Sequence, residues 1–174
     1  MACQPTKPWQ IALMRTFLLL IASCLTLGAA DSTEKVHQLR EFNLGRYLTG
    51  PRISEGAMKD KATAIVCMGT LSSNPHSWAA AWTPEFEDLH KSSGAKVTVI
   101  GAAWGKGLAP KDYAEYAKKF KLEFTLVNGI EHAPFEVPRD GHCLIFNADG
   151  KLIYSGQPNK GNQDFKDAIA AISK

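Results

Sequence analysis

The sequence predicts one α/β domain built on a mixed β-sheet with helices on both faces. Two short apolar runs, 63–70 and 97–104, are rich in β-branched residues, and each precedes a segment whose apolar residues recur at helical spacing. A third apolar run, 143–154, has Asn147–Gly150 at its centre, which is typical of a hairpin turn. Parallel strands joined by helices in a βαβ unit and followed by an antiparallel β-hairpin form a mixed sheet.

The first 30 residues have the features of an export signal. Arg15 precedes an apolar run at 17–22, and small residues at 28–30 offer a cleavage site before Asp31. We therefore expect a signal peptide over residues 1–30 and an exported protein, periplasmic or secreted. The apolar run is shorter than the roughly 20 residues that a membrane-spanning helix needs, so we expect no membrane span.

Two features of this leader leave alternatives open. Met14 is a second candidate start, because residues 1–13 make an unusually long extension. The stretch 21–24 resembles a lipoprotein box, in which Cys24 would carry the lipid anchor. Only a short apolar stretch precedes Cys24, and this favours cleavage after Ala30.

The charge of the processed chain argues against a nucleic-acid partner. Removing residues 1–30 takes away Lys7 and Arg15 and no acidic residue, so the 20 basic residues fall to 18 against 17 acidic ones. A net charge of +1 provides no basic surface for phosphate groups or for an anionic membrane.

A helix is expected after the first strand. Asn74 can cap its free N–H groups, and Pro75 suits the first helical position because that position needs no N–H. Pro84 should bend the helix, which is expected to end near residues 92–94. One buried face is defined by aromatic and aliphatic residues at helical spacing: Trp78, Trp82, Phe86 and Leu89.

The other segments are expected as follows. Residues 31–40 are polar and expected to be a flexible N-terminal segment, and the folded domain is expected over 41–174. The remaining segments are a short strand or hairpin arm at 42–48, a helix at 112–120, an extended piece at 122–127, a loop at 131–141 and a closing helix at 163–173.

Two sequence segments carry a resemblance to a known family. Residues 82–89, Trp-Thr-Pro-Glu-Phe-Glu-Asp-Leu, resemble the Met-Pro-Glu-Leu helix of exported redoxins and thiol reductases, and residues 144–153 resemble their Phe-Leu-Ile-Asp-x-Asp-Gly-Lys hairpin. With the order of the elements, these segments resemble the thioredoxin-like superfamily over roughly residues 40–174. The resemblance implies a thioredoxin-like fold with a redox site between the strand 63–70 and the helix that follows.

The redox motifs of that family are not kept in this chain. Counted from the strand, the two positions of the family's Cys-x-x-Cys motif fall on Ser72 and Pro75. Counted back from Pro84, they fall on His76 and Ala79. The peroxide-reducing pattern Thr-x-x-Cys falls on residues 70–73 and places Ser73 at the cysteine, and the family's cis-proline falls on Gly141.

Thiol exchange needs a thiolate in an exposed, electropositive turn and a sulfur that can form a mixed disulfide. A serine hydroxyl does not ionise appreciably near neutral pH and forms no disulfide. The sequence therefore excludes dithiol reduction and cysteine-based peroxide reduction at this turn.

Cys67 and Cys143 remain after removal of the leader, and both stand in apolar strands. Such positions are typical of buried structural cysteines. The alternative is a redox role, for example a cross-strand disulfide, if the two strands are neighbours and the thiols directly opposed.

Two further chemistries can be drawn from the same residues. Imidazole and carboxylate groups could bind copper or zinc at four candidate positions: His76, His132, Asp140 and His142. Their spacing is not diagnostic of a metal site, and scattered surface histidines are the better explanation. Ser72 or Ser73 with His76 as a base lacks a Gly-x-Ser-x-Gly elbow and an orienting carboxylate. We expect no cofactor.

These observations predict a non-catalytic binding protein for a peptide segment or partner protein of the cell envelope. The predicted binding surface is the vacated redox site, formed by Ser72, Ser73, Asn74, His76, Trp78, Asp140 and Gly141. The alternative is a thiol-disulfide or peroxide oxidoreductase that uses Cys67, Cys143 or a bound metal.

Overall fold

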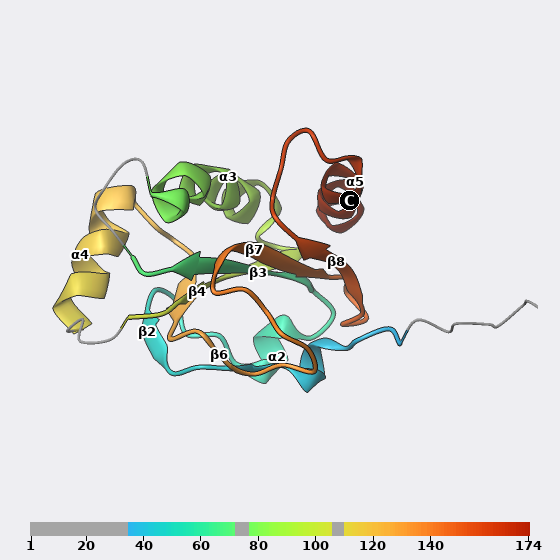
Figure 1. Ribbon diagram of the computed structural model, residues 1–174, viewed down its shortest axis with the longest axis horizontal. Coiled ribbons are helices and arrows are strands. Elements are labelled where there is room, and N and C mark those ends of the chain that lie inside the picture. Colours follow the sequence, from blue (N-terminus) through green and yellow to red (C-terminus); the bar gives the residue numbers. More distant parts are fainter. Residues whose placement is uncertain (1–34, 72–76, 106–109) are drawn as a thin grey trace, which may run out of the picture. The chain divides into compact units, whose positions relative to one another are not determined.

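The computed structural model describes residues 35–71, 77–105 and 110–174 (Figure 1). One compact unit spans Val36–Lys174. It includes part of the segment 31–40 that the sequence indicates to be flexible. Gln38 forms an antiparallel β-bridge with Lys151, and the Leu39 N–H donates a hydrogen bond to the Gly150 carbonyl at 2.8 Å.

A six-stranded mixed sheet forms the centre of this unit, as predicted. Its central strand pairs in parallel with the strand on one side and antiparallel with the strand on the other, a second parallel pair follows, and the two edge strands are antiparallel to their neighbours. In spatial order the strands are β2 (Tyr47–Thr49), β5 (Thr125–Val127), β4 (Val97–Ala103), β3 (Ala62–Gly69), β7 (Asp140–Phe146) and β8 (Leu152–Gly156).

Two strands outside this sheet differ from the prediction. The segment 42–48 is not one strand. It contains β1 (Asn43–Leu44), which belongs to a separate two-stranded sheet, and it runs into β2, which is an edge strand of the six-stranded sheet. β1 pairs with β6 (Ile130–His132), which lies at the edge of the predicted loop 131–141. The chain changes partner at Gly45, whose N–H donates to the Gly129 carbonyl at 2.9 Å.

The three long helices are α3 (Trp78–Ser93), α4 (Pro110–Phe120) and α5 (Gln163–Ser173). α3 begins at Trp78 with Ser77 as its N-cap, whose hydroxyl accepts a hydrogen bond from the Ala80 N–H at 3.2 Å. Asn74 and Pro75 themselves lie outside the described residues. Pro84 stands inside α3, and the hydroxyl of the preceding Thr83 donates to the Ala79 carbonyl at 2.6 Å.

The core lies on both faces of β3, whose eight residues are all buried. Ala64, Val66 and Met68 point into a cluster with residues of α3, α4 and α5, whereas Ile65 points into a second cluster on the opposite face. The second face is covered by β1, β6, the loop 133–139 and two short helices, α2 (Glu55–Met58) and η1 (Leu39–Glu41). Helices therefore lie on both faces, but the long ones share one face (Figure 1).

The described residues contain no helix with the length and apolar character needed to cross a bilayer.

Candidate functional site

The predicted site lies where three chain segments meet at the carboxyl end of β3. The Gly69 N–H donates to the Arg139 carbonyl at 2.7 Å, and the Gly69 carbonyl accepts from the Trp104 N–H at 2.8 Å. Met68 is paired with Asp140 across the sheet. The structure therefore brings the start of β7, with Asp140 and Gly141, beside the end of β3, as the sequence predicted.

Trp78 covers Gly141, the position expected for the family's cis-proline. A side chain on Gly141 would place its Cβ 3.4 Å from Trp78 Nε1, and the φ of Gly141 is +68°, a conformation that favours glycine. Every described peptide bond is trans. Gly141 thus lies in contact with the indole of Trp78, and its backbone conformation rather than a lack of space favours glycine.

Trp78 also begins a row of aromatic rings along α3. Its ring centroid lies 6.4 Å from that of Trp82, which meets Phe165 of α5 edge-on at 6.2 Å. Trp78 and Trp82 are partly buried, while Phe86 and Leu89 are buried, so the predicted buried face of this helix is confirmed. Trp78 is the first residue of α3, so this partly buried ring lies beside the predicted site.

The other predicted site residues are distributed as follows. Ala79 is buried in the first turn of α3, with an exposed fraction of 2%. Asp140 is exposed at the start of β7. Five of the predicted positions lie outside the described residues: Ser72, Ser73, Asn74, Pro75 and His76.

Cys67 and Cys143 are free and fully buried, on neighbouring strands. Cys67 is paired with His142, and Cys143 with Val66, so the two thiols are offset by one residue. Successive side chains of a strand point to opposite faces, so the two thiols lie on opposite faces of the sheet. The cross-strand disulfide considered from the sequence is not compatible with this register.

Burial also disfavours ionisation of both thiols. It raises the pKa of Cys67 from 9.0 to about 12, with a further contribution from the nearby Asp140 carboxylate. Burial likewise raises the pKa of Cys143. A thiol that stays protonated is a poor nucleophile and a poor metal ligand.

The candidate metal ligands among the described residues do not gather. No three His, Cys, Asp or Glu side chains of the described ranges are placed to share a metal ion. His132 is exposed on β6. His142 Nε2 lies 3.0 Å from the Ser155 hydroxyl, and burial lowers the pKa of its imidazole.

Two residues that the sequence did not single out, Trp104 and Arg139, also lie at the carboxyl end of β3. Trp104 directly follows β4, a strand parallel to β3. The carboxyl ends of parallel strands meet at the same edge of a sheet. That rule could have placed Trp104 near the site, whereas nothing in the sequence marks Arg139.

Comparison with solved structures shows that this chain has a thioredoxin-like fold. A thiol-disulfide isomerase from Corynebacterium glutamicum is 13% identical, with 81% of this chain and 99% of the other covered at a TM-score of 0.57. A DsbF homologue from Corynebacterium diphtheriae is 15% identical, with 80% and 88% covered and a TM-score of 0.57. A secreted Mycobacterium tuberculosis disulfide oxidoreductase is 17% identical, with 74% and 94% covered and a TM-score of 0.52.

These identities define the fold alone. No protein-family model matches the chain, and no curated protein matches it significantly.

Proposed function

We propose that this protein is an exported, non-catalytic thioredoxin-like domain that binds an extended peptide segment or a partner protein of the cell envelope. The observation that carries the proposal is where the cysteines stand in the chain. No cysteine occurs between Thr70 and Lys91, the turn and helix where the fold would hold its redox pair. The two thiols of the described chain are buried in β3 and β7 with raised pKa values.

The start of α3 favours one of the two alignments of the Cys-x-x-Cys motif with this chain. Because Ser77 caps the helix, His76 immediately precedes the cap and Ala79 lies in the first turn. A cysteine pair separated by two residues would occupy these positions, since a helix N-terminus lowers the pKa of a thiol there. We therefore assign the vacated redox positions to His76 and Ala79 rather than to Ser72 and Pro75.

The surface beside these positions suits a polypeptide ligand. Trp78 offers a partly exposed aromatic ring, and Asp140 offers an exposed carboxylate at the same corner. Aromatic side chains with a polar neighbour are typical of protein-binding surfaces. Thioredoxin-like sites accommodate extended polypeptides, so Ser72, Ser73 and Asn74 are assigned to the same surface.

Affinity capture from a cell-envelope extract tests the binding. The mature domain, beginning at Asp31, serves as bait beside His76→Ala and Trp78→Ala variants. Lys166→Ala, on the exposed face of α5, is the matched control. We expect one or more proteins to be retained by the wild type and by Lys166→Ala and lost from the other two. Equal retention by all four baits contradicts the assigned surface.

Insulin-disulfide and peroxide reduction test the absence of catalysis. We expect no turnover above the uncatalysed rate. Turnover that disappears in Cys67→Ser or Cys143→Ser would establish the alternative, an oxidoreductase that uses a buried thiol. Turnover that disappears on chelation would establish the metal-dependent alternative.

A further inference from the structure

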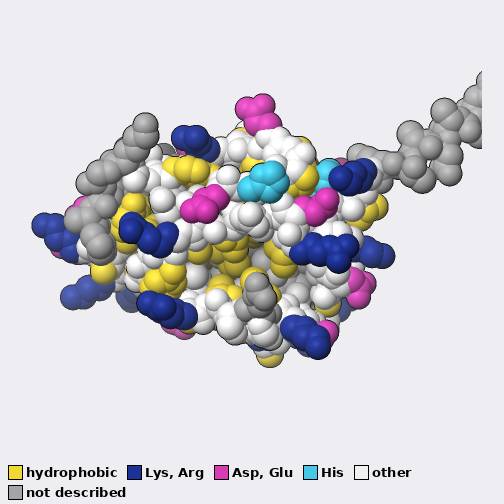
Figure 2. All heavy atoms as spheres, turned by 90° about the horizontal axis from the view of Figure 1, so that it is seen from below, with side chains coloured by type: hydrophobic (Ala, Val, Ile, Leu, Met, Phe, Trp, Pro, Cys, Tyr) yellow, Lys and Arg dark blue, Asp and Glu magenta, His cyan; other side chains and the backbone are white. Residues whose placement is uncertain are grey.

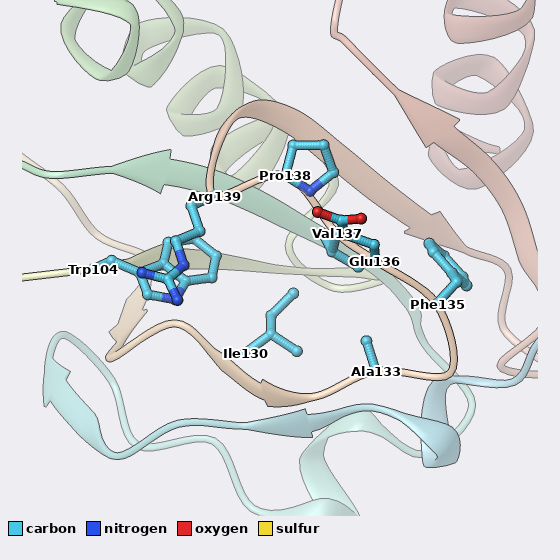
Figure 3. Close-up of a pocket in the computed structure, with 8 residues that line it drawn as sticks. All are labelled: Trp104, Ile130, Ala133, Phe135, Glu136, Val137, Pro138 and Arg139. Carbon is cyan, nitrogen blue, oxygen red and sulfur yellow. The ribbon is translucent and has the colours of Figure 1, made fainter.

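A pocket of about 490 Å³ lies on the sheet face opposite α3 (Figure 3). Its apolar wall is formed by Trp104, Ile130, Phe135 and Val137, and its charged groups are Glu136 and Arg139. The space-filling view from below shows this face of the molecule, with hydrophobic side chains exposed near its centre and Lys or Arg side chains around them (Figure 2). The volume is within the range of about 300–1,000 Å³ that is common for small-molecule sites.

The walls of the pocket are fixed by the fold. The Trp104 N–H is hydrogen-bonded to Gly69, and its indole packs on Gly129, where a Cβ would come within 2.4 Å of Nε1. At the other end, the Phe135 ring lies 5.0 Å from the ring of His37 and 5.6 Å from that of Phe42. Both ends are therefore preformed, which lowers the entropic cost of binding.

The two charged side chains of the pocket have no partner among the described residues. Glu136 and Arg139 are exposed, and neither belongs to the ion pairs found within the described ranges. They stand three residues apart in one loop, with Arg139 at the Trp104 end of the pocket (Figure 3). One positive and one negative group thus border the same apolar wall.

We propose that this pocket binds a free amino acid with a large apolar side chain. The ligand's carboxylate pairs with the Arg139 guanidinium, which can donate two parallel hydrogen bonds to it. The ligand's ammonium pairs with Glu136, and its side chain packs against Trp104, Ile130 and Phe135. A ligand with only one charge would leave either Glu136 or Arg139 unmatched, so the zwitterion is the best fit to both.

Calorimetric titration of the mature domain with L-phenylalanine and two truncated analogues tests this assignment. Phenethylamine lacks the carboxylate, and 3-phenylpropionate lacks the ammonium. We expect L-phenylalanine to bind and each analogue to bind about tenfold more weakly or less, since each leaves a charge unpaired. Glycine, which lacks the apolar group, should bind more weakly still.

Variants of the two charged residues then test which group of the ligand each one binds. Arg139→Ala should weaken L-phenylalanine about tenfold and leave phenethylamine unchanged, while Glu136→Gln should weaken L-phenylalanine and leave 3-phenylpropionate unchanged. Both side chains are exposed, and circular dichroism checks that the fold is kept. Lys166→Ala is the charge-matched control for Arg139→Ala.

Three results would overturn the proposal: no heat of binding for L-phenylalanine at millimolar concentration, equal affinity for 3-phenylpropionate, or unchanged affinity in both variants. The readout is a small-molecule isotherm, so its outcome is independent of peptide capture at the α3 surface.

Discussion

Cys67 and Cys143 lie on adjacent strands yet face opposite sides of the sheet, because Cys67 is paired with His142 and Cys143 with Val66. Each thiol is therefore enclosed by a different part of the core. The two sulfur atoms can neither bond to one another nor reach solvent without local opening of the sheet.

The first prediction concerns alkylation of these thiols. In a native protein that spans residues 31–174, iodoacetamide at pH 8 should label neither cysteine within the time that labels a free peptide thiol, because both are buried and protonated. After unfolding without reductant, mass spectrometry should find two labels. A count of zero after unfolding would reveal a disulfide, and rapid native labelling would reveal an accessible thiol.

The second prediction concerns stability at high pH. An unfolded cysteine ionises near its ordinary pKa of 9.0, whereas folded Cys67 stays protonated up to about pH 12. Between these values the unfolded state binds fewer protons, so the free energy of unfolding falls as pH rises, by about 1.4 kcal/mol per pH unit for a fully ionising thiol. The full contribution of this thiol is present below pH 9.

Urea titrations between pH 8 and pH 11 measure this slope. Cys67→Ala is the comparison, because other groups also titrate in that range and remain in both proteins. We expect a shallower loss of stability in Cys67→Ala. Parallel curves would show that Cys67 ionises equally in the folded and unfolded chains.

The third prediction concerns the missing redox pair. The double variant His76→Cys with Ala79→Cys should form a reversible disulfide and reduce insulin, because it restores a Cys-x-x-Cys spacing around the N-terminus of α3. The variant Ser72→Cys with Pro75→Cys places both thiols ahead of the helix and should be inactive. Activity in the second variant only would reverse our assignment of the register.

The fourth prediction concerns Gly141. Gly141→Ala should destabilise the domain by about 1 kcal/mol or more, because an L-residue is strained at φ +68°. Thermal unfolding should show a melting temperature lower by about 3–5 °C. Gly56→Ala is a matched control, since its Cβ would meet nothing closer than the Ser54 hydroxyl at 3.9 Å. Equal melting temperatures for the two variants would contradict the strain.

The fifth prediction concerns Glu87, a buried carboxylate with an exposed fraction of 5%. Its two oxygens accept hydrogen bonds from the Glu123 N–H at 3.0 and 3.2 Å, and Lys91 lies 3.3 Å away. Glu87→Ala should cost about 1–3 kcal/mol, because it leaves that N–H without its acceptor.

Chemical denaturation measures this loss. Glu85→Ala, on the same helix, removes an exposed ion pair with Lys160 and should cost about 1 kcal/mol or less. If Glu85→Ala proves as costly as Glu87→Ala, the acceptor role of Glu87 is not what stabilises the contact.

The sheet and the long helices could be predicted because their patterns are long and periodic. The run at 63–70 and the hairpin at 143–154 match β3, β7 and β8 within a few residues. The short elements β1, β6 and α2 could not be predicted in this way. Two to four residues carry no periodicity, and these elements exist because of pairing or capping by distant or neighbouring groups.

The corner of the site was predicted in part. The expected meeting of Asp140 and Gly141 with the end of β3 depends on the pairing of β7 with β3, which the order of elements implies. The start of α3 could be placed only to within one turn, because Ser77 offers a capping hydroxyl as well as the Asn74 side chain, and the described helix begins after Ser77. The pocket around Arg139 depends on the path of the loop 133–139, which has no repeating pattern.

The central position of β3 has a practical consequence. Its backbone amides are hydrogen-bonded to strands on both sides and shielded above and below, so they should exchange with deuterium only when the whole domain opens. The exchange rate of a β3 peptide in mass spectrometry would therefore report global stability directly, without denaturant, for every variant described above.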